Sequence, residues 1–413
     1  GSFYTIKQLW SPVQIMNTSV DKQFDGKFSV ENRYDYLNLN TCRFLWKQVK
    51  FPTATDASNT TAQVLKQGEV QGSDVAAHSA GVLDIKTTIL PDADALFLTA
   101  IDRYGHELWR WTFPVNKLNQ ANEVLSPLSN KVTSTETENE LTVKAKNHTF
   151  IFSKKDGQLK GVSVNNRKIS FANGPRFIGA RRADRSLDQF YNHDDEKAKE
   201  KDRTYSEFPD AAVFTKLDVK EDGGNLIVTA NYKLGNLDKA QWTINPSGEA
   251  VLDYTYNFSG VVDLMGICFD YPEDQVISKR WLGAGPYRVW QNRIHGTQYD
   301  VWENDYNDPI PGETFTYPEF KGYFGSVSWM NIRTKEGTIS LTNETPDAYI
   351  GVYQPRDGRD RLLYTLPESG ISVLNVIPPV RNKVNSTDLC GPSSQPKWVN
   401  GPQSGRIIFR FME

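Results

Sequence analysis

Polar and apolar residues alternate in short runs along most of this chain. The run ELTVKAKNHTFIFSKKDGQLKGVSV, at residues 140–164, alternates on both sides of a Lys-Asp-Gly step at 155–157, which predicts a hairpin. A second hairpin is predicted about the Asn-Pro-Ser-Gly step at 245–248, because proline and glycine supply the restricted and left-handed backbone positions of a turn. No long stretch shows the periodicity of an amphipathic helix. The pattern predicts an all-β protein.

The alternating runs fall into two regions of different size. Residues 14–118 are predicted to form a small β-sandwich, with a hairpin about Tyr104 and Gly105. A polar linker is expected at 119–130, and residues 131–413 are predicted to form one large β-sandwich rather than two small ones. Residues 1–13 form a short segment ahead of the first sandwich. A chain of 413 residues is also too long for one ordinary core, which favours several domains.

Composition and charge exclude some partners. The 47 basic and 50 acidic side chains nearly cancel, so neither nucleic acid nor an anionic membrane surface is an expected partner. Three distant cysteines, Cys42, Cys268 and Cys390, can form at most one disulfide. No apolar run is long enough to span a bilayer and no leader precedes the first residues. The opening Gly-Ser pair is typical of an expression remnant, so the compartment stays open, periplasmic or extracellular included.

Signatures of several enzyme classes are missing from the sequence. It contains no G-x-S-x-G elbow, no phosphate-binding glycine loop, no H-E-x-x-H and no C-x-x-C. The five histidines show no metal-ligand spacing, so no transition-metal site is expected. Ten tryptophans and eighteen tyrosines, by contrast, are a high content of the planar side chains that suit sugar rings.

Two sets of residues are candidates for chemistry within this chain. Glycoside hydrolysis needs two carboxyl groups about 5 to 10 Å apart, and Glu303, Asp305 and Glu319 lie in or near aromatic runs. The Asn-Asp and Asp-Pro steps there favour turn residues over a catalytic pair. The alternative is a polysaccharide-lyase-like site, in which Asn292, His295 and Tyr299 supply carboxylate neutralisation and acid–base groups.

A densely charged segment interrupts the large sandwich. Residues 181–207 are poor in aliphatic side chains, so they cannot add much to a core and are predicted to be a solvated loop or short exposed helix. The alternative is a loop at the rim of a site, with Asp184, Asp188 or His193 facing a ligand.

Four motifs, in order, resemble the C-terminal portion of glycoside hydrolase family two β-galactosidases. FYTIKQLWSPVQI resembles the strip that follows the catalytic barrel, and FSVENRYDYLNLNTCRFLWKQV resembles the immunoglobulin-like domain after it. KRWLGAGPYRVWQNR and TYPEFKGYFGSVSWM resemble two neighbouring elements of the large C-terminal sandwich. The matching residues of these two elements are Trp281, Gly283, Gly285, Pro286, Arg293, Pro318, Glu319 and Gly322.

The resemblance implies a fold for this chain and a separate domain that holds the catalytic residues. The fold is an immunoglobulin-like β-sandwich followed by a large galactose-mutarotase-like β-supersandwich. In the family, the catalytic glutamates and the magnesium ligands belong to a (β/α)8 barrel with no counterpart here. This chain is therefore expected to be inactive alone and to bind no cofactor, with magnesium in the missing barrel. The implied partners are that barrel, the N-terminal domains of the same protein, a galactoside or other glycan, and a second copy of the chain.

The resemblance also implies sugar-contacting residues. One loop of the family's large sandwich places a tryptophan against the sugar, and the matching loop, LCGPSSQPKWV at 389–399, makes Trp398 the candidate. Arg181 and Asp184 are further carbohydrate-binding candidates. The residues before Trp398 are less acidic than the family pattern, and GPRFIGARRADRSLDQF replaces an Arg-Ala-Pro-x-Asp-Asn-Asp run. Another glycan, such as one from plant cell walls, is compatible with these departures.

Plain structural roles are the alternative for the remaining motif residues. Trp281, Trp290, Trp302 and Trp329 are expected to pack in a core or between domains. Gly283 and Gly285 are expected to permit a bulge or tight turn. A stand-alone carbohydrate-binding sandwich protein is the second function class that the sequence leaves open.

Overall fold

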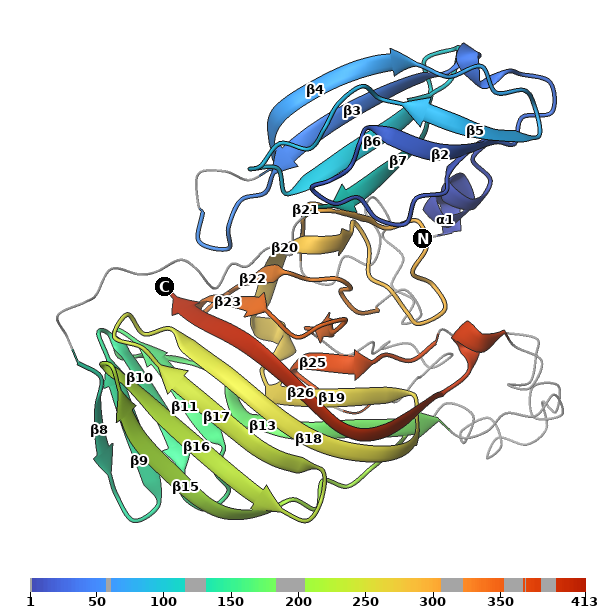
Figure 1. Ribbon diagram of the computed structural model, residues 1–413. Helices are drawn as coiled ribbons and strands as arrows, with labels where there is room; N and C mark the ends of the chain where they lie inside the picture. Colours follow the sequence, from blue (N-terminus) through green and yellow to red (C-terminus); the bar gives the residue numbers. More distant parts are fainter. Residues whose placement is uncertain are drawn as a thin grey trace, which may run out of the picture. The chain divides into compact units, whose positions relative to one another are not determined.

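The computed structural model describes residues 2–56, 61–115, 131–182, 205–305, 322–352, 367, 369–379 and 391–413. The chain divides into two compact units (Figure 1). The first contains Gly1–Asn122 with Leu282–Tyr287 and His295–Trp302, and the second contains Glu123–Trp281, Arg288–Ile294 and Glu303–Glu413. Strands make up 59% of the structure and the described ranges contain one α-helix, so the predicted all-β class is confirmed. The domain limits inferred from the sequence stay a prediction, because residues 116–130 lie outside the described ones.

The first unit is a two-sheet sandwich preceded by helix α1 (Ser2–Leu9). One sheet has the order β1 (Val13–Ile15), β2 (Lys27–Asn32) and β5 (Ser79–Asp84). The other has the order β4 (Gln63–Gln71), β3 (Arg43–Lys50), β6 (Ala95–Ile101) and β7 (Glu107–Pro114). The short 3-10 helix η1 (Leu39–Thr41) precedes β3. The predicted hairpin about Tyr104 and Gly105 joins β6 to β7, which pair antiparallel.

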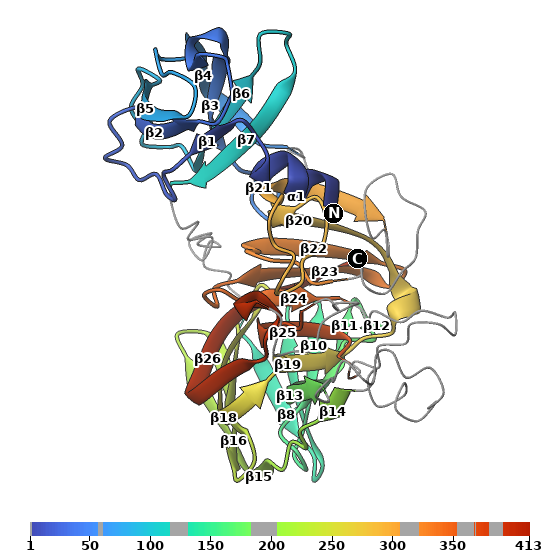
Figure 2. The same cartoon turned by 90° about the vertical axis from the view of Figure 1, so that its right-hand side faces the viewer.

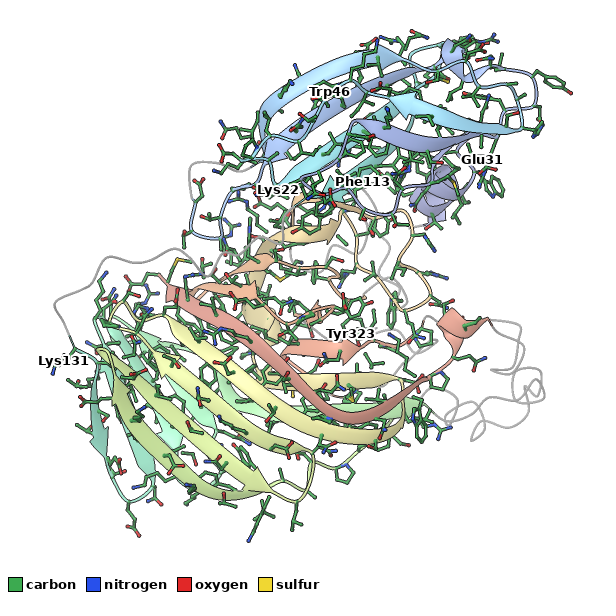
Figure 3. All side chains as sticks on the ribbon, viewed as in Figure 1. Lys22, Glu31, Trp46, Phe113, Lys131 and Tyr323 are labelled. Atoms are coloured by element: carbon green, nitrogen blue, oxygen red, sulfur yellow. The ribbon has the colours of Figure 1, made fainter. Side chains whose placement is uncertain are left out.

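Aromatic rings fill the space between these two sheets. Phe28 of β2 and Phe113 of β7 stack with ring centroids 5.2 Å apart, which joins one sheet to the other. Trp46 and Phe44 of β3 are buried in the same cluster (Figure 3 labels Trp46 and Phe113). Alternate residues of β3 face this core because successive side chains of a strand point to opposite faces. The expected immunoglobulin-like sandwich is thereby confirmed.

The second unit contains two large antiparallel sheets. The ten-stranded sheet has the order β24 (Tyr349–Gly351), β25 (Ile371–Val376), β19 (Leu264–Asp270), β13 (Ala172–Arg182), β11 (Leu159–Val164), β10 (His148–Ser153), β9 (Glu140–Ala145) and β8 (Thr133–Glu136), with β12 (Arg167–Ile169) paired to β11 and β14 (Tyr205–Glu207) paired to β13. The nine-stranded sheet has the order β15 (Val213–Asp222), β16 (Asn225–Lys233), β17 (Leu237–Ile244), β18 (Ala250–Val262), β26 (Lys397–Met412), β23 (Gly337–Asn343), β22 (Trp329–Thr334), β20 (Val276–Gly285) and β21 (Gln298–Asp305). Two 3-10 helices, η3 (Glu273–Gln275) and η6 (Pro392–Ser394), precede β20 and β26.

One aromatic core joins the two large sheets. Phe171 stacks on Phe269 of β19 with ring centroids 4.6 Å apart, and it contacts Phe409 of β26 at 5.1 Å. Trp242 of β17 lies 5.9 Å from Phe409 and 6.0 Å from Phe269. Because β19 belongs to one sheet and β17 and β26 to the other, these rings form a shared interior. The sheets therefore make one large sandwich, as the sequence predicted.

Both hairpins predicted within the large sandwich are confirmed. Gly157 has a φ of 73° between β10 and β11, and Asp156 accepts a hydrogen bond from the Gln158 N–H at 3.0 Å. Gly248 has a φ of 91° between β17 and β18. There the side-chain oxygen of Asn245 accepts N–H groups from residues two and four positions later, at 3.1 and 3.0 Å. Side-chain acceptors of this kind fix a turn locally, which is why the sequence signal was readable.

A buried tyrosine predicts a fall in stability at alkaline pH. Burial raises the pKa of Tyr254, on β18, to about 12. Between pH 10 and pH 12 the unfolded chain ionises this phenol while the folded chain does not, so stability is lost as pH rises through this window. The loss from this one group is at most about 2 to 3 kcal/mol. Urea unfolding of the parent and of Tyr254→Phe from pH 9 to 11.5 should give a shallower decline in the variant, and identical declines would refute the assignment.

Candidate functional site

Trp398 presents its indole to solvent at the start of the longest strand. It is the second residue of β26 and pairs with Val261 of β18, and Figure 2 shows these two strands side by side. The side chain is 71% exposed. Polar groups flank it along the same two strands, because the Ser259 hydroxyl donates to the Asn400 side-chain oxygen at 2.9 Å. The surface at the start of β26 thus combines an exposed aromatic face with hydroxyl and amide groups.

The loop before Trp398 is held by the glycine-proline motif. Gln291 donates its side-chain N–H to the Gln395 carbonyl at 2.7 Å, and Asn292 donates to the Ser394 hydroxyl at 3.1 Å. All four residues belong to the second unit. Each pair of bonded residues is about a hundred positions apart in the sequence. The motif that resembles the β-galactosidase sandwich therefore positions the loop that leads to the candidate tryptophan.

The two sandwich motifs lie against each other in the second unit. Val289 and Tyr323 exchange backbone hydrogen bonds at 2.7 and 2.8 Å, and the Trp290 and Tyr323 rings meet edge-on at 5.7 Å (Figure 3 labels Tyr323). Gly322 is required by this contact, since a Cβ there would lie 2.2 Å from the Val289 carbonyl oxygen. Trp281 packs edge-on against Phe324 at 4.8 Å. Residues 288–293 thus form a rigid support for the anchored loop.

Gly285 has a different role from the predicted bulge or tight turn. It is the last residue of β20, and a Cβ there would lie 2.3 Å from the Trp302 ring, so the absent side chain makes room for that indole. The same indole N–H donates to the Gly283 carbonyl at 3.2 Å. Gly285, Gly283 and Trp302 all belong to the first unit. Pro286 follows through a cis peptide bond. Arg293 is exposed and its N–H closes a tight turn on the Trp290 carbonyl at 2.9 Å.

Arg181 lies near the same strand ends as the candidate tryptophan. It is half-buried near the end of β13, next to Ala180, whose carbonyl accepts the Asp263 N–H at 3.0 Å. Val262, directly before Asp263, pairs with Lys397, the residue preceding the exposed indole. The ends of β13, β18 and β26 therefore converge. Asp263 is a buried carboxylate that sequence reasoning missed, and its position between two apolar runs was the available signal.

Several sequence candidates fall outside the described residues. These are Asp184, Asp188, His193, Pro318 and Glu319. Their roles stay predictions.

Glu303 and Asp305 do not lie in the turn that the sequence predicted. They are exposed residues at the end of β21, two positions apart and therefore on one face of the strand. The Asp305 backbone carbonyl accepts a hydrogen bond from the buried Lys279 ammonium at 2.6 Å. Strand pairing here overrides the turn preference of the Asn-Asp step.

The residues of the lyase-like alternative belong to different units. Asn292 is in the second unit, where its amide donates to Ser394, whereas His295 and Tyr299 are in the first. The Tyr299 ring packs edge-on against Phe51 at 5.6 Å. The His295 carbonyl accepts the Thr5 hydroxyl at 2.9 Å. The Tyr299 ring and the Asn292 amide therefore have structural contacts, while the contact at His295 involves only its backbone, and the lyase-like role of the three residues stays a prediction.

The described residues form neither a metal-binding cluster nor a membrane-spanning helix. Within the described ranges, His, Cys, Asp and Glu side chains form no group of three or more that could hold a metal ion. Among the helices that the structure describes, none is both long and apolar enough to cross a bilayer. The described cysteines, Cys42 and Cys268, are buried free thiols, and burial raises the pKa of each.

The second unit is a large two-sheet sandwich, and the first unit is a smaller immunoglobulin-like one. A family model described as beta galactosidase small chain matches residues 144–376, more than half of the chain. The chain belongs to this family. The predicted likeness to the C-terminal portion of a β-galactosidase is confirmed at this level, whereas the assignment to glycoside hydrolase family two and the galactose mutarotase-like character of the large sandwich stay predictions.

Solved structures with a similar arrangement include two proteins named for sugar isomerisation. Galactose 1-epimerase from Lactobacillus acidophilus NCFM is 10% identical, with a TM-score of 0.39, over 68% of this chain and 98% of its own. A putative mutarotase from Salmonella typhimurium is 8% identical, with a TM-score of 0.32, over 70% of this chain and 96% of its own. A search of curated protein sequences found no match.

Proposed function

We propose that this chain is the non-catalytic C-terminal part of a β-galactosidase-like glycoside hydrolase, in which Trp398 contacts the glycan and completes the sugar pocket of a catalytic barrel. One observation supports this best. An exposed indole stands at the start of β26, directly after a segment that the motif resembling the β-galactosidase sandwich anchors through Gln291 and Asn292. Contact of an exposed indole with water has a free-energy cost that a bound ligand would relieve. The anchored loop before it fixes its orientation in advance of binding.

The chemistry at Trp398 fits a neutral sugar. The apolar CH face of a galactose-like ring stacks on a flat indole, while hydroxyl groups need hydrogen-bonding partners beside it. Ser259 and Asn400 are such groups on the paired strands. Arg181 lies at the neighbouring strand end and is proposed to contact the same glycan, together with Asp184.

Catalysis is proposed to take place outside this chain. Retaining hydrolysis needs an acid–base carboxyl and a nucleophilic carboxylate about 5 Å apart. We place both, with any magnesium, in a barrel contributed by the same protein. The substrate is a galactoside or another glycan, and the role of Trp398 is to bind and orient it.

Binding of methyl β-galactoside and lactose tests this role. Saturation-transfer NMR and tryptophan fluorescence on the 413-residue chain should detect weak binding, and Trp398→Ala should weaken it by about tenfold, equivalent to roughly 1.4 kcal/mol. Trp10→Ala is the matched control, because Trp10 is also exposed, at 79%, but belongs to the first unit. Equal effects of the two substitutions, or none from Trp398→Ala, would contradict the assignment.

Hydrolysis of a chromogenic aryl β-galactoside tests the proposal that the catalytic carboxylates lie outside this chain. The chain alone is expected to show no turnover. Turnover that disappears in Glu303→Gln would make this sandwich an enzyme in its own right and would overturn the proposal.

A further inference from the structure

Three loops meet at one end of the first unit. The start of β3 pairs with the end of β4 and with the end of β6, through Arg43 opposite Gln71 and Ile101. The end of β2 pairs with the start of β5. The connections 33–42, 72–78 and 102–106 therefore leave the sandwich at the same end, on the right of the blue unit in Figure 1. We call residues 33–38, 72–78 and 102–106 the loop end.

Two tyrosines of the loop end are largely exposed to solvent. Tyr36 is 94% exposed and Tyr104 is 68% exposed. The Arg103 guanidinium lies over the Tyr104 ring, 4.7 Å from its centroid, and holds the ring against the hairpin. The His106 ring is 6.4 Å from the same ring. Two exposed aromatic rings on loops that leave the sandwich at the same end are candidates for ligand contact, because binding residues are often carried by loops on a rigid scaffold.

Hydrogen-bonding groups accompany the aromatic rings. Asp35 and His78, both largely exposed, lie 3.1 Å apart across two loops. His78 adopts a left-handed φ of 54°, a conformation that is unfavourable for a side chain bearing a Cβ. Burial raises the pKa of the Tyr34 phenol, whose oxygen lies 3.9 Å from the Cys42 sulfur. Charges of both signs are present, so a neutral ligand fits better than a polyanion.

Buried polar groups hold the loop end in one conformation. The Asn32 amide donates to the Leu37 carbonyl and to the Val75 carbonyl, both at 2.9 Å, and its oxygen accepts the Tyr34 N–H at 3.0 Å. One side chain thus ties the first loop to the second. Asp102 accepts the N–H groups of residues 104 and 106, each at 2.8 Å, which fixes the hairpin that carries the second exposed tyrosine. Preformed loops lose little entropy when a ligand binds.

We propose that the loop end is a second glycan-binding site, for a neutral oligosaccharide that lies across Tyr36 and Tyr104 and donates hydroxyl hydrogen bonds to Asp35. Stacking on tyrosine faces suits the CH surfaces of pyranose rings, and a carboxylate accepts from vicinal hydroxyls. The site belongs wholly to the first unit and uses no residue of the Trp398 loop. It would hold a polymeric substrate to the protein while the hydrolytic pocket acts on another part of it.

The experiment uses the Trp398→Ala chain, so that the sugar surface of the second unit does not contribute. Isothermal titration with β-1,4-linked galactohexaose should show binding, and the added pair Tyr36→Ala and Tyr104→Ala should weaken it at least tenfold. The pair Tyr36→Phe and Tyr104→Phe keeps the rings and should retain most of the affinity. Met16→Ala, another exposed apolar residue of the first unit, is the matched surface control.

Each outcome decides the question. Loss of binding in the alanine pair, with retention in the phenylalanine pair and in the control, supports the site. No binding by the Trp398→Ala parent, or equal binding by the parent and the alanine pair, overturns it and leaves a protein partner as the occupant of these tyrosines. Stronger binding of a galacturonate hexamer than of the neutral hexamer would overturn the neutral class. None of these results depends on whether Trp398 binds sugar.

Discussion

Replacement of Trp281 by alanine is expected to lower the free energy of unfolding of the second unit by about 3 to 5 kcal/mol. The side chain is fully buried and packs edge-on against Phe324 with ring centroids 4.8 Å apart. Truncation removes a large apolar surface and leaves a cavity that close-packed neighbours cannot fill. Urea denaturation followed by far-ultraviolet circular dichroism measures the change.

The matched control for this substitution is Trp398→Ala. The chemical change is identical, but the indole is 71% exposed, so the expected change in unfolding free energy is within about 0.5 kcal/mol. Similar losses from the two substitutions would show that the exposed indole is packed against something in solution. A small loss at Trp281 would show that the second unit tolerates a void beside the two sandwich motifs.

Asn32→Ala is expected to destabilise the first unit by about 2 to 4 kcal/mol. Asn32 is fully buried, and its removal leaves the Leu37 carbonyl and the Tyr34 N–H without the partners they have now. The Val75 carbonyl loses less, because it also accepts the Leu39 N–H at 3.0 Å. A buried polar group that loses its partner costs more than the hydrogen bond itself contributes.

Thermal unfolding and hydrogen exchange check the Asn32 substitution. Exchange should accelerate most in residues 33–38 and 72–78, which this side chain connects. Asn40→Ala, at an exposed position of the same connection, should change stability by no more than about 0.5 kcal/mol. Uniform acceleration across β3 and β6 would instead show that the loops and the sandwich open together. The same variant should also weaken glycan binding at the loop end, because the loops would no longer be preformed.

Local signals in the sequence predicted much of the fold. The hairpins at 155–157 and 245–248 were readable because their turns depend on residues within the turn, such as Asp156 and Asn245. Alternation of polar and apolar residues predicted strands because each strand has one face against a core. The short helix α1 was not predicted, since eight residues give too little periodicity to detect.

Roles that depend on distant residues were not predictable in the same way. Position 285 requires glycine because the indole of Trp302, seventeen positions later, fills the space of a side chain there. The residues near Gly285 in the sequence give no sign of this contact. In the sequence Asn32 is an ordinary polar residue, and its structural role follows only from the fold, which brings the Val75 carbonyl within hydrogen-bond distance. Trp398 was expected to follow a loop rather than to lie in a strand, whereas it is the second residue of β26, and the anchoring of the preceding residues through Gln291 required the folded chain. The turn expected at Glu303 and Asp305 was wrong because sheet pairing decided the backbone there.

The anchoring of the Trp398 loop has an evolutionary consequence. Gln291 binds the backbone carbonyl of residue 395 rather than its side chain, so any amino acid at that position preserves the bond. The side chain of residue 395 can therefore change without loss of this bond, whereas Ser394 is held through its own hydroxyl group by Asn292. A lineage could therefore adapt to new sugars by substitutions at residue 395, beside the exposed indole, while the strands that hold the indole stay unaltered.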